Sequence, residues 1–118
     1  MAVTSVANEN QTAVITTEHT LFTSSAAGVY VYIVDCGLPT DGTPHMSNGD
    51  VLELRIYSIV NGGTEHLAYY AVYAHSQAHP VKYSVPVPTP TAGDTLKFTL
   101  KQTVGTGRIF PYRVVTVG

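Results

Sequence analysis

Short runs in which apolar and polar side chains alternate recur along this chain, with turn residues between them. The run from 94 to 103, DTLKFTLKQT, places Leu96, Phe98 and Leu100 on one face and its lysines on the other. A period of two residues is typical of a strand with one buried face. No window shows a sustained helical period of 3.6 residues. We therefore predict an all-β protein, a sandwich or a small barrel.

The number and length of these runs favour a single jelly-roll-like β-sandwich with seven to eight antiparallel strands. After an extended segment at 2–17, the expected strands lie at 19–24, 28–35, 50–60, 64–75, 81–88, 94–103 and 108–117. The polar stretch NENQ interrupts the extended segment. We therefore predict an extended N-terminal arm over residues 1–10 and one β-sandwich domain over residues 11–118.

Turn residues refine this arrangement. The sequence Asn-Gly-Gly at 61–63 predicts a hairpin between its flanking strands, because Asn and Gly accept positive φ. Proline cannot donate a main-chain hydrogen bond, so the prolines in 81–88 predict an edge strand. Pro111 likewise predicts that 108–117 is an edge strand or carries a bulge. The segment 36–50 is rich in Gly, Pro, Asn and Asp, and we expect a long loop there.

Charge and cysteine content exclude several classes of protein. Only 12% of the 118 residues are charged, about half the usual share, and the formal net charge is −2. No basic run is present, so we expect no nucleic-acid partner. The N-terminus lacks the pattern of a signal peptide and no apolar run is long enough to span a bilayer, so we expect no membrane partner and synthesis in a reducing cytosol. The single cysteine, Cys36, is expected to be a small, partly buried thiol.

A glycine-rich stretch, Gly105-Thr106-Gly107-Arg108, has two interpretations. Glycine-rich loops that bind phosphate lead into a helix, whose free amides meet the anion. Here the following residues, 109–117, have the pattern of a strand, and the Lys-Ser/Thr ending of a phosphate loop is missing. We therefore interpret VGTG as a hairpin connection, with Arg108 paired to a neighbouring carboxylate or main-chain oxygen.

No constellation of residues predicts catalysis or metal binding. The five histidines do not share a helix face or a metal-ligand spacing; they are His19, His45, His66, His75 and His79. The acids around the long loop match no calcium-binding pattern, and Asp50 is expected to bind the amides of its own turn. We predict that the protein is not an enzyme and has no cofactor or metal.

Outward-facing tyrosines provide the best candidate for an interface. Alternation in 50–60 directs Leu52, Leu54 and Ile56 inward, and the residues between them outward. Exposed tyrosine is common in protein interfaces and sugar sites, whereas packing between strands is the alternative role for any one tyrosine. With the apolar residues of the arm, the candidate interface comprises Val3, Val6, Glu53, Arg55, Tyr57 and Tyr70.

Several motifs give the chain a resemblance to a known group. They are Asn48-Gly49-Asp50, Leu52-Glu53-Leu54, Gly62-Gly63-Thr64, and Leu100-Lys101-Gln102-Thr103 followed by Gly105-Thr106-Gly107-Arg108. In these motifs the chain, from about residue 12 to its end, resembles small β-rich virion proteins of tailed bacteriophages. The run LKQT-x-GTGR is the most specific part. The segment 36–47 is longer than the usual link in the group.

The resemblance implies a structural component of the particle, specifically a capsid decoration or cement protein that binds and stabilises the assembled head. The implied partners are the major capsid protein and further copies of the chain, in a trimer or dimer. The implied location is the capsid surface of the virion, with synthesis and assembly in the host cytoplasm. A tail- or fibre-associated sandwich module that binds carbohydrate or a receptor is the alternative, and a neck component is a third.

Overall fold

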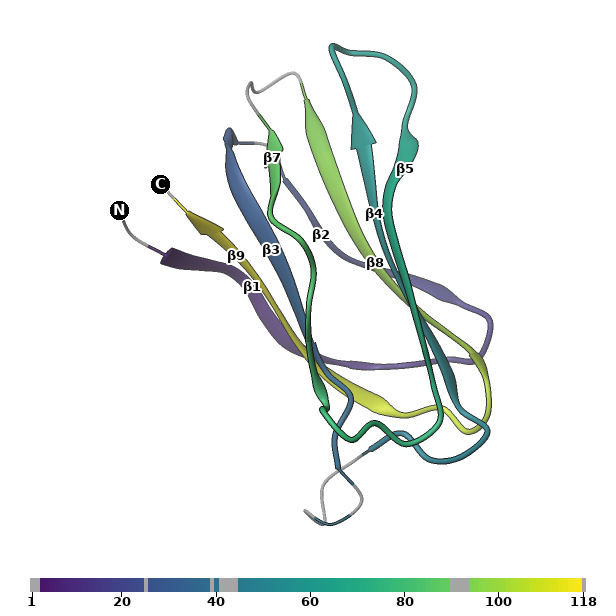
Figure 1. Cartoon of the computed structure of the whole chain (residues 1–118). Helices are drawn as coiled ribbons and strands as arrows, with labels where there is room; N and C mark the ends of the chain where they lie inside the picture. Colours follow the sequence, from purple (N-terminus) through teal and green to yellow (C-terminus); the bar gives the residue numbers. More distant parts are fainter. Residues whose placement is uncertain (1–2, 25, 39, 41–44, 90–93, 118) are drawn as a thin grey trace.

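A computed structural model of the chain describes residues 3–24, 26–38, 40, 45–89 and 94–117. Over these residues the fold is all-β, with nine antiparallel strands and no α-helix (Figure 1). The strands are β1 (Val3–Thr12), β2 (Glu18–Thr23), β3 (Gly28–Asp35), β4 (Val51–Ile59), β5 (His66–Ala74), β6 (Val81–Tyr83), β7 (Val87–Thr89), β8 (Thr95–Val104) and β9 (Ile109–Val117). The described part of the chain contains no helix that is long and apolar enough to cross a membrane.

The strands form two sheets. Sheet A has the order β1-β9-β3-β6, and β7 also pairs with β3; sheet B has the order β2-β8-β4-β5. Both short strands lie along the same side of β3, where β6 pairs with residues 33–35 and β7 with residues 28–30. Together they occupy the segment for which one strand, 81–88, was expected. The prediction that this segment lies at a sheet edge is confirmed.

The two sheets face each other across one hydrophobic core. The ring of Tyr32, from β3 in sheet A, meets the ring of Phe98, from β8 in sheet B, edge-on at 5.7 Å between centroids. The Tyr32 hydroxyl donates a hydrogen bond of 2.9 Å to the main-chain oxygen of Thr99. A buried tyrosine hydroxyl needs such a partner, and here the partner belongs to the opposite sheet. This side chain therefore ties the two sheets together.

Alternation predicted correctly which side chains enter this core. Leu52, Leu54 and Ile56 of β4 are buried, and the residues between them face outward and are partly buried. In β8 the three predicted core residues, Leu96, Phe98 and Leu100, are buried as well. In β3 one face is buried, at residues 30, 32 and 34, and the other is half-buried.

The hairpin predicted at residues 61–63 is confirmed. Asn61 and Gly62 have φ values of 54° and 69°, and the amide of Gly63 donates to the carbonyl of Val60. Two successive positive φ angles define a type I′ turn, whose twist matches that of a hairpin. The turn connects β4 and β5, which pair along most of their length.

The hairpin predicted around residues 104–107 is wrong. β8 belongs to sheet B and β9 to sheet A, so this connection crosses from one sheet to the other. Pro111 was expected to mark an edge strand or a bulge. The edge position is wrong, because β9 lies between β1 and β3, and the register shift between β1 and β9 lies at Ser5 and Ala7, away from Pro111. Pro111 is tolerated because the pairing with β3 ends at Tyr112, and Pro111 itself pairs only with Asn10 of β1. Its missing donor therefore falls where β9 has one neighbour.

The N-terminal segment forms an edge strand in the structure. From Val3 to Thr12 it pairs with β9, with one register shift between Ser5 and Ala7. The division expected at residue 10, between arm and domain, thus falls inside β1. Residues 1 and 2 of the expected arm lie outside the described residues. So does the middle of the long loop, at 39 and 41–44.

Candidate interaction surface

The outer face of sheet B carries four of the six residues predicted for an interface. The Nη2 atom of Arg55 lies 2.7 Å from Oε1 of Glu53, and the Tyr70 hydroxyl donates to Oε2 of the same glutamate at 3.3 Å. The guanidinium carbon of Arg55 lies 4.8 Å from the centre of the Tyr70 ring. Strands β4 and β5 pair Arg55 with Tyr70, which is why these groups meet.

A second group on this face centres on Glu18 of β2. Its Oε2 accepts hydrogen bonds from the Tyr57 hydroxyl at 2.7 Å and from the Thr99 hydroxyl at 2.6 Å. Burial alone would raise the pKa of Glu18, but these two hydrogen bonds and the nearby cations lower it below its usual value. Tyr57 also packs under Lys97, whose Nζ lies 4.8 Å from the ring centre. The carboxylate is therefore ionised and held in place at neutral pH.

One polar atom on this face lacks a protein partner. The Nη1 atom of Arg55 is buried and forms no hydrogen bond with any described residue. A buried donor without an acceptor is costly, and such atoms are rare in folded proteins. The face thus combines aromatic rings, compensated charges and one unsatisfied donor.

The edge strand next to this face is apolar and exposed. Strand β5 has the sequence HLAYYAVYA, with no charged residue and no proline. Leu67, Tyr70 and Val72 are about half exposed, at 51%, 46% and 51%. An edge strand of this kind offers unpaired main-chain groups and apolar side chains to another chain.

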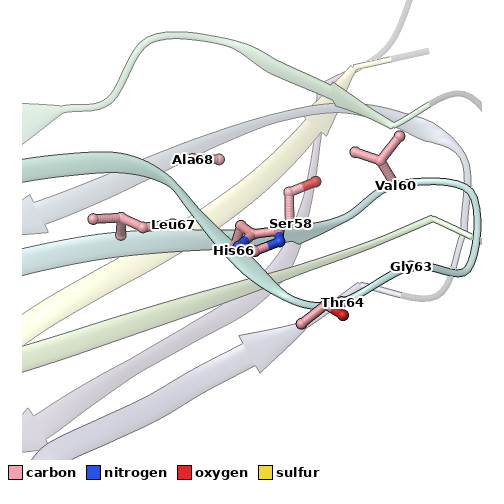
Figure 2. Close-up of a pocket in the computed structure, with 7 residues that line it drawn as sticks. All are labelled: Ser58, Val60, Gly63, Thr64, His66, Leu67 and Ala68. Carbon is pink, nitrogen blue, oxygen red and sulfur yellow. The ribbon is translucent and has the colours of Figure 1, made fainter.

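An open pocket of about 470 Å³ adjoins the start of β5, at the tip of the β4–β5 hairpin. Its lining is mainly apolar and is shown in Figure 2; it comprises Ser58, Val60, Gly63, Thr64, His66, Leu67 and Ala68. His66 is the one titratable residue in this lining, and it lies opposite Ser58 in the β4–β5 ladder. A pocket of this composition suits an apolar side chain.

The six predicted interface residues do not form one surface. Glu53, Arg55, Tyr57 and Tyr70 lie together on sheet B, as described above. Val3 and Val6 belong to β1 of sheet A; Val6 packs against the core, and Val3 is 68% exposed. The expectation that the N-terminal residues and the tyrosines share an interface stays a prediction.

The sequence interpretation did not include Glu18, Leu67 and Val72. Glu18 joins the surface because β2 pairs with β8, which no local pattern shows. The two apolar residues had a signal that was present in the sequence. A segment of nine residues without charge or proline next to a hairpin turn indicates a strand whose edge is unprotected.

The glycine-rich stretch 105–108 is fixed by a buried carboxylate. Asp50 is 1% exposed, and its Oδ2 accepts from Nε of Arg108 at 2.7 Å and from the amide of Ser47 at 2.9 Å. Its Oδ1 accepts from the amide of Thr106 at 3.2 Å. The predictions that Asp50 binds its own turn and that Arg108 pairs with a carboxylate are both confirmed. The arginine is therefore engaged inside the protein.

Two further features hold this connection in place. The side chain of Gln102 donates to the carbonyl oxygens of Val104 and Thr106 and accepts from the amide of Arg108. Gly105 has a φ of 100°, and a Cβ added there would collide with Asp50. Only glycine fits such a position without strain. The stretch has a structural role, in carrying the chain from sheet B to sheet A.

Cys36 is buried, and burial raises the pKa of its thiol to about 12. A thiol that stays protonated is a poor nucleophile. Among residues 3–24, 26–38, 40, 45–89 and 94–117, no group of three or more His, Cys, Asp or Glu could hold a metal ion.

Comparison with known proteins does not assign the chain to a family. No protein-family model, curated protein or solved structure matches it. The function has to be inferred from the residues and their arrangement.

Proposed function

We propose that this protein is a structural component of a bacteriophage virion, a decoration protein that binds the assembled capsid and stabilises it. The observation that carries the proposal is the outer face of sheet B with its apolar edge strand, β5. That surface combines exposed Leu67 and Val72, tyrosines, compensated charges and an unsatisfied arginine nitrogen. The resemblance of residues 12–118 to phage virion proteins supplies the kind of partner, the major capsid protein.

We also propose that the fold is a jelly roll. Every connection except the β4–β5 hairpin and the short β6–β7 link joins one sheet to the other. The β6–β7 pair then counts as one interrupted strand, which makes eight. Two four-stranded sheets wound in this way are typical of capsid and lectin domains. Such a fold leaves both sheets with edges through which it can bind other chains.

The proposed action is mechanical and requires no chemistry. A decoration protein bridges neighbouring capsid subunits, so its binding energy opposes their separation. Main-chain pairing at an edge strand provides affinity, and side-chain pockets provide specificity. The open pocket beside Leu67 is suited to an apolar side chain of the shell. We propose that the protein is not an enzyme and acts at the capsid surface.

Capsid binding tests the proposal directly. Purified protein should co-sediment with expanded capsids that lack it, and mass spectrometry should find it in purified virions. Leu67→Asp should weaken co-sedimentation, because the carboxylate enters an apolar contact, whereas Val104→Asp at an equally exposed position on another strand should not. Absence from virions together with no binding to capsids would overturn the proposal.

The predicted contribution of the N-terminal segment needs a milder test than truncation. Removal of residues 1–10 would delete most of β1, a strand that pairs with β9, and so would damage the fold. Val3→Asp changes an exposed side chain and leaves the pairing intact. If this segment docks on the shell, the variant should occupy fewer capsid sites. Unchanged occupancy would show that the segment takes no part.

The alternative is a carbohydrate- or receptor-binding module associated with the tail or fibre. The observation in its favour is that the rings of Tyr70 and Tyr83 are exposed, because such rings stack on sugars. A glycan array probed with the isolated protein separates the two proposals. Specific glycan binding that Tyr83→Ala abolishes would support the alternative.

A further inference from the structure

The four sheet edges of this protein differ in how well they are protected against pairing with another chain. Strand β1 has a register shift and carries Glu9, and β2 has a register shift and carries Glu18. The edge formed by β6 and β7 is short and interrupted, with prolines in and beside it. Charges, bulges, prolines and short strands are the devices that keep edges from pairing.

Strand β5 has none of these devices over its last six residues. From Tyr69 to Ala74 its register with β4 is continuous, and this stretch contains no charged residue or proline. Its outer side chains, Tyr70 and Val72, are exposed. In an otherwise protected fold, an edge of this kind indicates that another strand covers it.

The direction of the main-chain groups on β5 follows from one hydrogen bond. The amide of His75 donates to the carbonyl of Asp50 at 2.8 Å, at the end of the β4–β5 ladder. In an antiparallel ladder, alternate residues turn their amide and carbonyl toward the partner. Residues 69, 71 and 73 therefore bond to β4. Tyr70, Val72 and Ala74 direct their amides and carbonyls to the free edge.

We infer that β5 pairs with β5 of a second copy of the chain, antiparallel about a two-fold axis at Ala71. This pairing would join the two B sheets, four strands from each copy, into one continuous sheet. On the outer face each Tyr70 lies opposite Val72 of the other copy, in a pair that exchanges main-chain hydrogen bonds. On the inner face each Tyr69 lies opposite Tyr73.

This register is favoured over its neighbours by the side chains that it brings together. Aromatic pairs and pairs of an aromatic with a β-branched residue are the stabilising cross-strand combinations. An axis at Ala71 forms four of them and places the small alanine where the two copies meet. An axis at Tyr70 or Val72 would instead match tyrosines with alanines. The sequence of β5 is thus complementary to itself in one register.

The charges beside β5 are complementary as well. Arg55 adjoins Tyr70, and Glu53 adjoins Val72, across the β4–β5 ladder. Each row of side chains across the dimer therefore runs from Arg55 and Tyr70 of one copy to Val72 and Glu53 of the other. Each row carries one positive and one negative side chain, so like charges do not face each other. This dimer does not depend on capsid binding. It occupies the β5 edge from Tyr69 to Ala74, so the capsid would contact the outer face of the joined sheets and the pocket beside Leu67.

Disulfide trapping tests the register. At a non-hydrogen-bonded antiparallel pair the Cα atoms lie about 4.5 Å apart, within the range that a disulfide spans. Ala71→Cys should therefore form a cross-linked dimer under mild oxidation. Ala74→Cys is the matched control, because its two copies would lie about 20 Å apart along the strands. Cys36 is buried and should not react.

Sedimentation velocity of the free chain tests the dimer itself. The natural protein should sediment as a dimer whose population rises with concentration. Val72→Lys should raise the dissociation constant about tenfold, because the symmetry removes the Tyr70–Val72 pair twice. Val104→Lys, at a valine of equal exposure on β8, should not change it.

Three results would overturn the inference: a monomer at all concentrations, equal cross-linking of the Ala71→Cys and Ala74→Cys variants, or equal effects of the two lysine variants. Circular dichroism of each variant shows that the fold is kept. These measurements use the protein without capsids. A dimer that fails to bind capsids would contradict the proposed function and leave this inference intact.

Discussion

Replacement of Asp50 by alanine should be among the most destabilising single changes in the protein. The carboxylate is buried and accepts from Arg108 Nε, Ser47 N and Thr106 N at 2.7, 2.9 and 3.2 Å. A hydrogen bond to a charged group contributes about 1.5–3 kcal/mol. The Arg108 side chain is 28% exposed and regains water when its partner is lost, so the lower end applies. With about 1.5 kcal/mol for each of the three hydrogen bonds, we expect a loss of about 4–5 kcal/mol in the free energy of unfolding.

The effect should depend on pH in a defined direction. Burial would raise the pKa of Asp50, but the hydrogen bonds from Ser47, Arg108 and Thr106 lower it below its usual value. A carboxyl whose pKa is lower in the folded state stabilises the protein above its unfolded pKa, about 3.9, and loses this effect as the pH falls through the folded value. The gap in stability between the natural protein and Asp50→Asn should therefore be largest at neutral pH and shrink below about pH 4.

Urea denaturation monitored by circular dichroism at pH 7, 5 and 3 measures both quantities. Asp94→Asn is a suitable control, because the Asp94 carboxylate accepts from the main-chain amide of Asn61 near the surface. Its replacement should cost under about 1 kcal/mol. The reasoning would be refuted if Asp50→Ala cost no more than this control. A pH-independent gap for Asp50→Asn would refute the account of the ionised carboxylate.

Three further predictions concern the core and the connections. Gly105→Ala should lower the free energy of unfolding by about 2 kcal/mol or more, because its Cβ would meet Asp50 at a position with positive φ. Gly62→Ala, also at positive φ but in open space, should cost about 1 kcal/mol. Thermal denaturation compares the two variants, and equal costs would contradict the collision with Asp50. Tyr32→Phe should lower the free energy of unfolding by about 1–2 kcal/mol, because it removes the hydrogen bond from the Tyr32 hydroxyl to a main-chain oxygen of β8. Urea denaturation measures this loss, and a neutral result would show that water replaces the hydroxyl. Cys36 should resist alkylation by iodoacetamide at pH 8 in the folded protein and react on unfolding, because its thiol is buried and has a pKa of about 12. Fast labelling of the folded protein would contradict this.

The inward and outward sides of the strands could be predicted from the sequence, because alternation is a local property. Leu52, Leu54 and Ile56 illustrate this, as does the type I′ turn at Asn61 and Gly62, which needs only positive φ. Proline at 86 and 88 predicted an edge for a similar reason, because the ring removes a donor wherever it stands. Each of these inferences depends on residues that are close in the sequence.

Strand partners could not be predicted, because pairing depends on residues far apart in the sequence. Alternation on both sides of Gly105 is compatible with a hairpin and with a crossing between sheets. Asp50 decides between them, and it lies in another loop. The candidate surface shows the same limit. Alternation gave the outward set around Arg55, whereas Glu18 and Val72 became part of it only once the neighbouring strands were known.

The central position of β9 has a consequence for how the chain folds as it is made. In sheet A, β9 separates β1 from β3 and pairs with both, yet the ribosome synthesises it after either of them (Figure 1). Until β9 emerges, β1 has no partner in that sheet, and β3 lacks its neighbour on one side. In sheet B, β8 likewise lies between two strands made before it, β2 and β4, but β8 emerges before β9 and so completes its sheet earlier. We therefore expect sheet B to form first on the ribosome, and sheet A to close in a late step that recruits the earliest strand to the last.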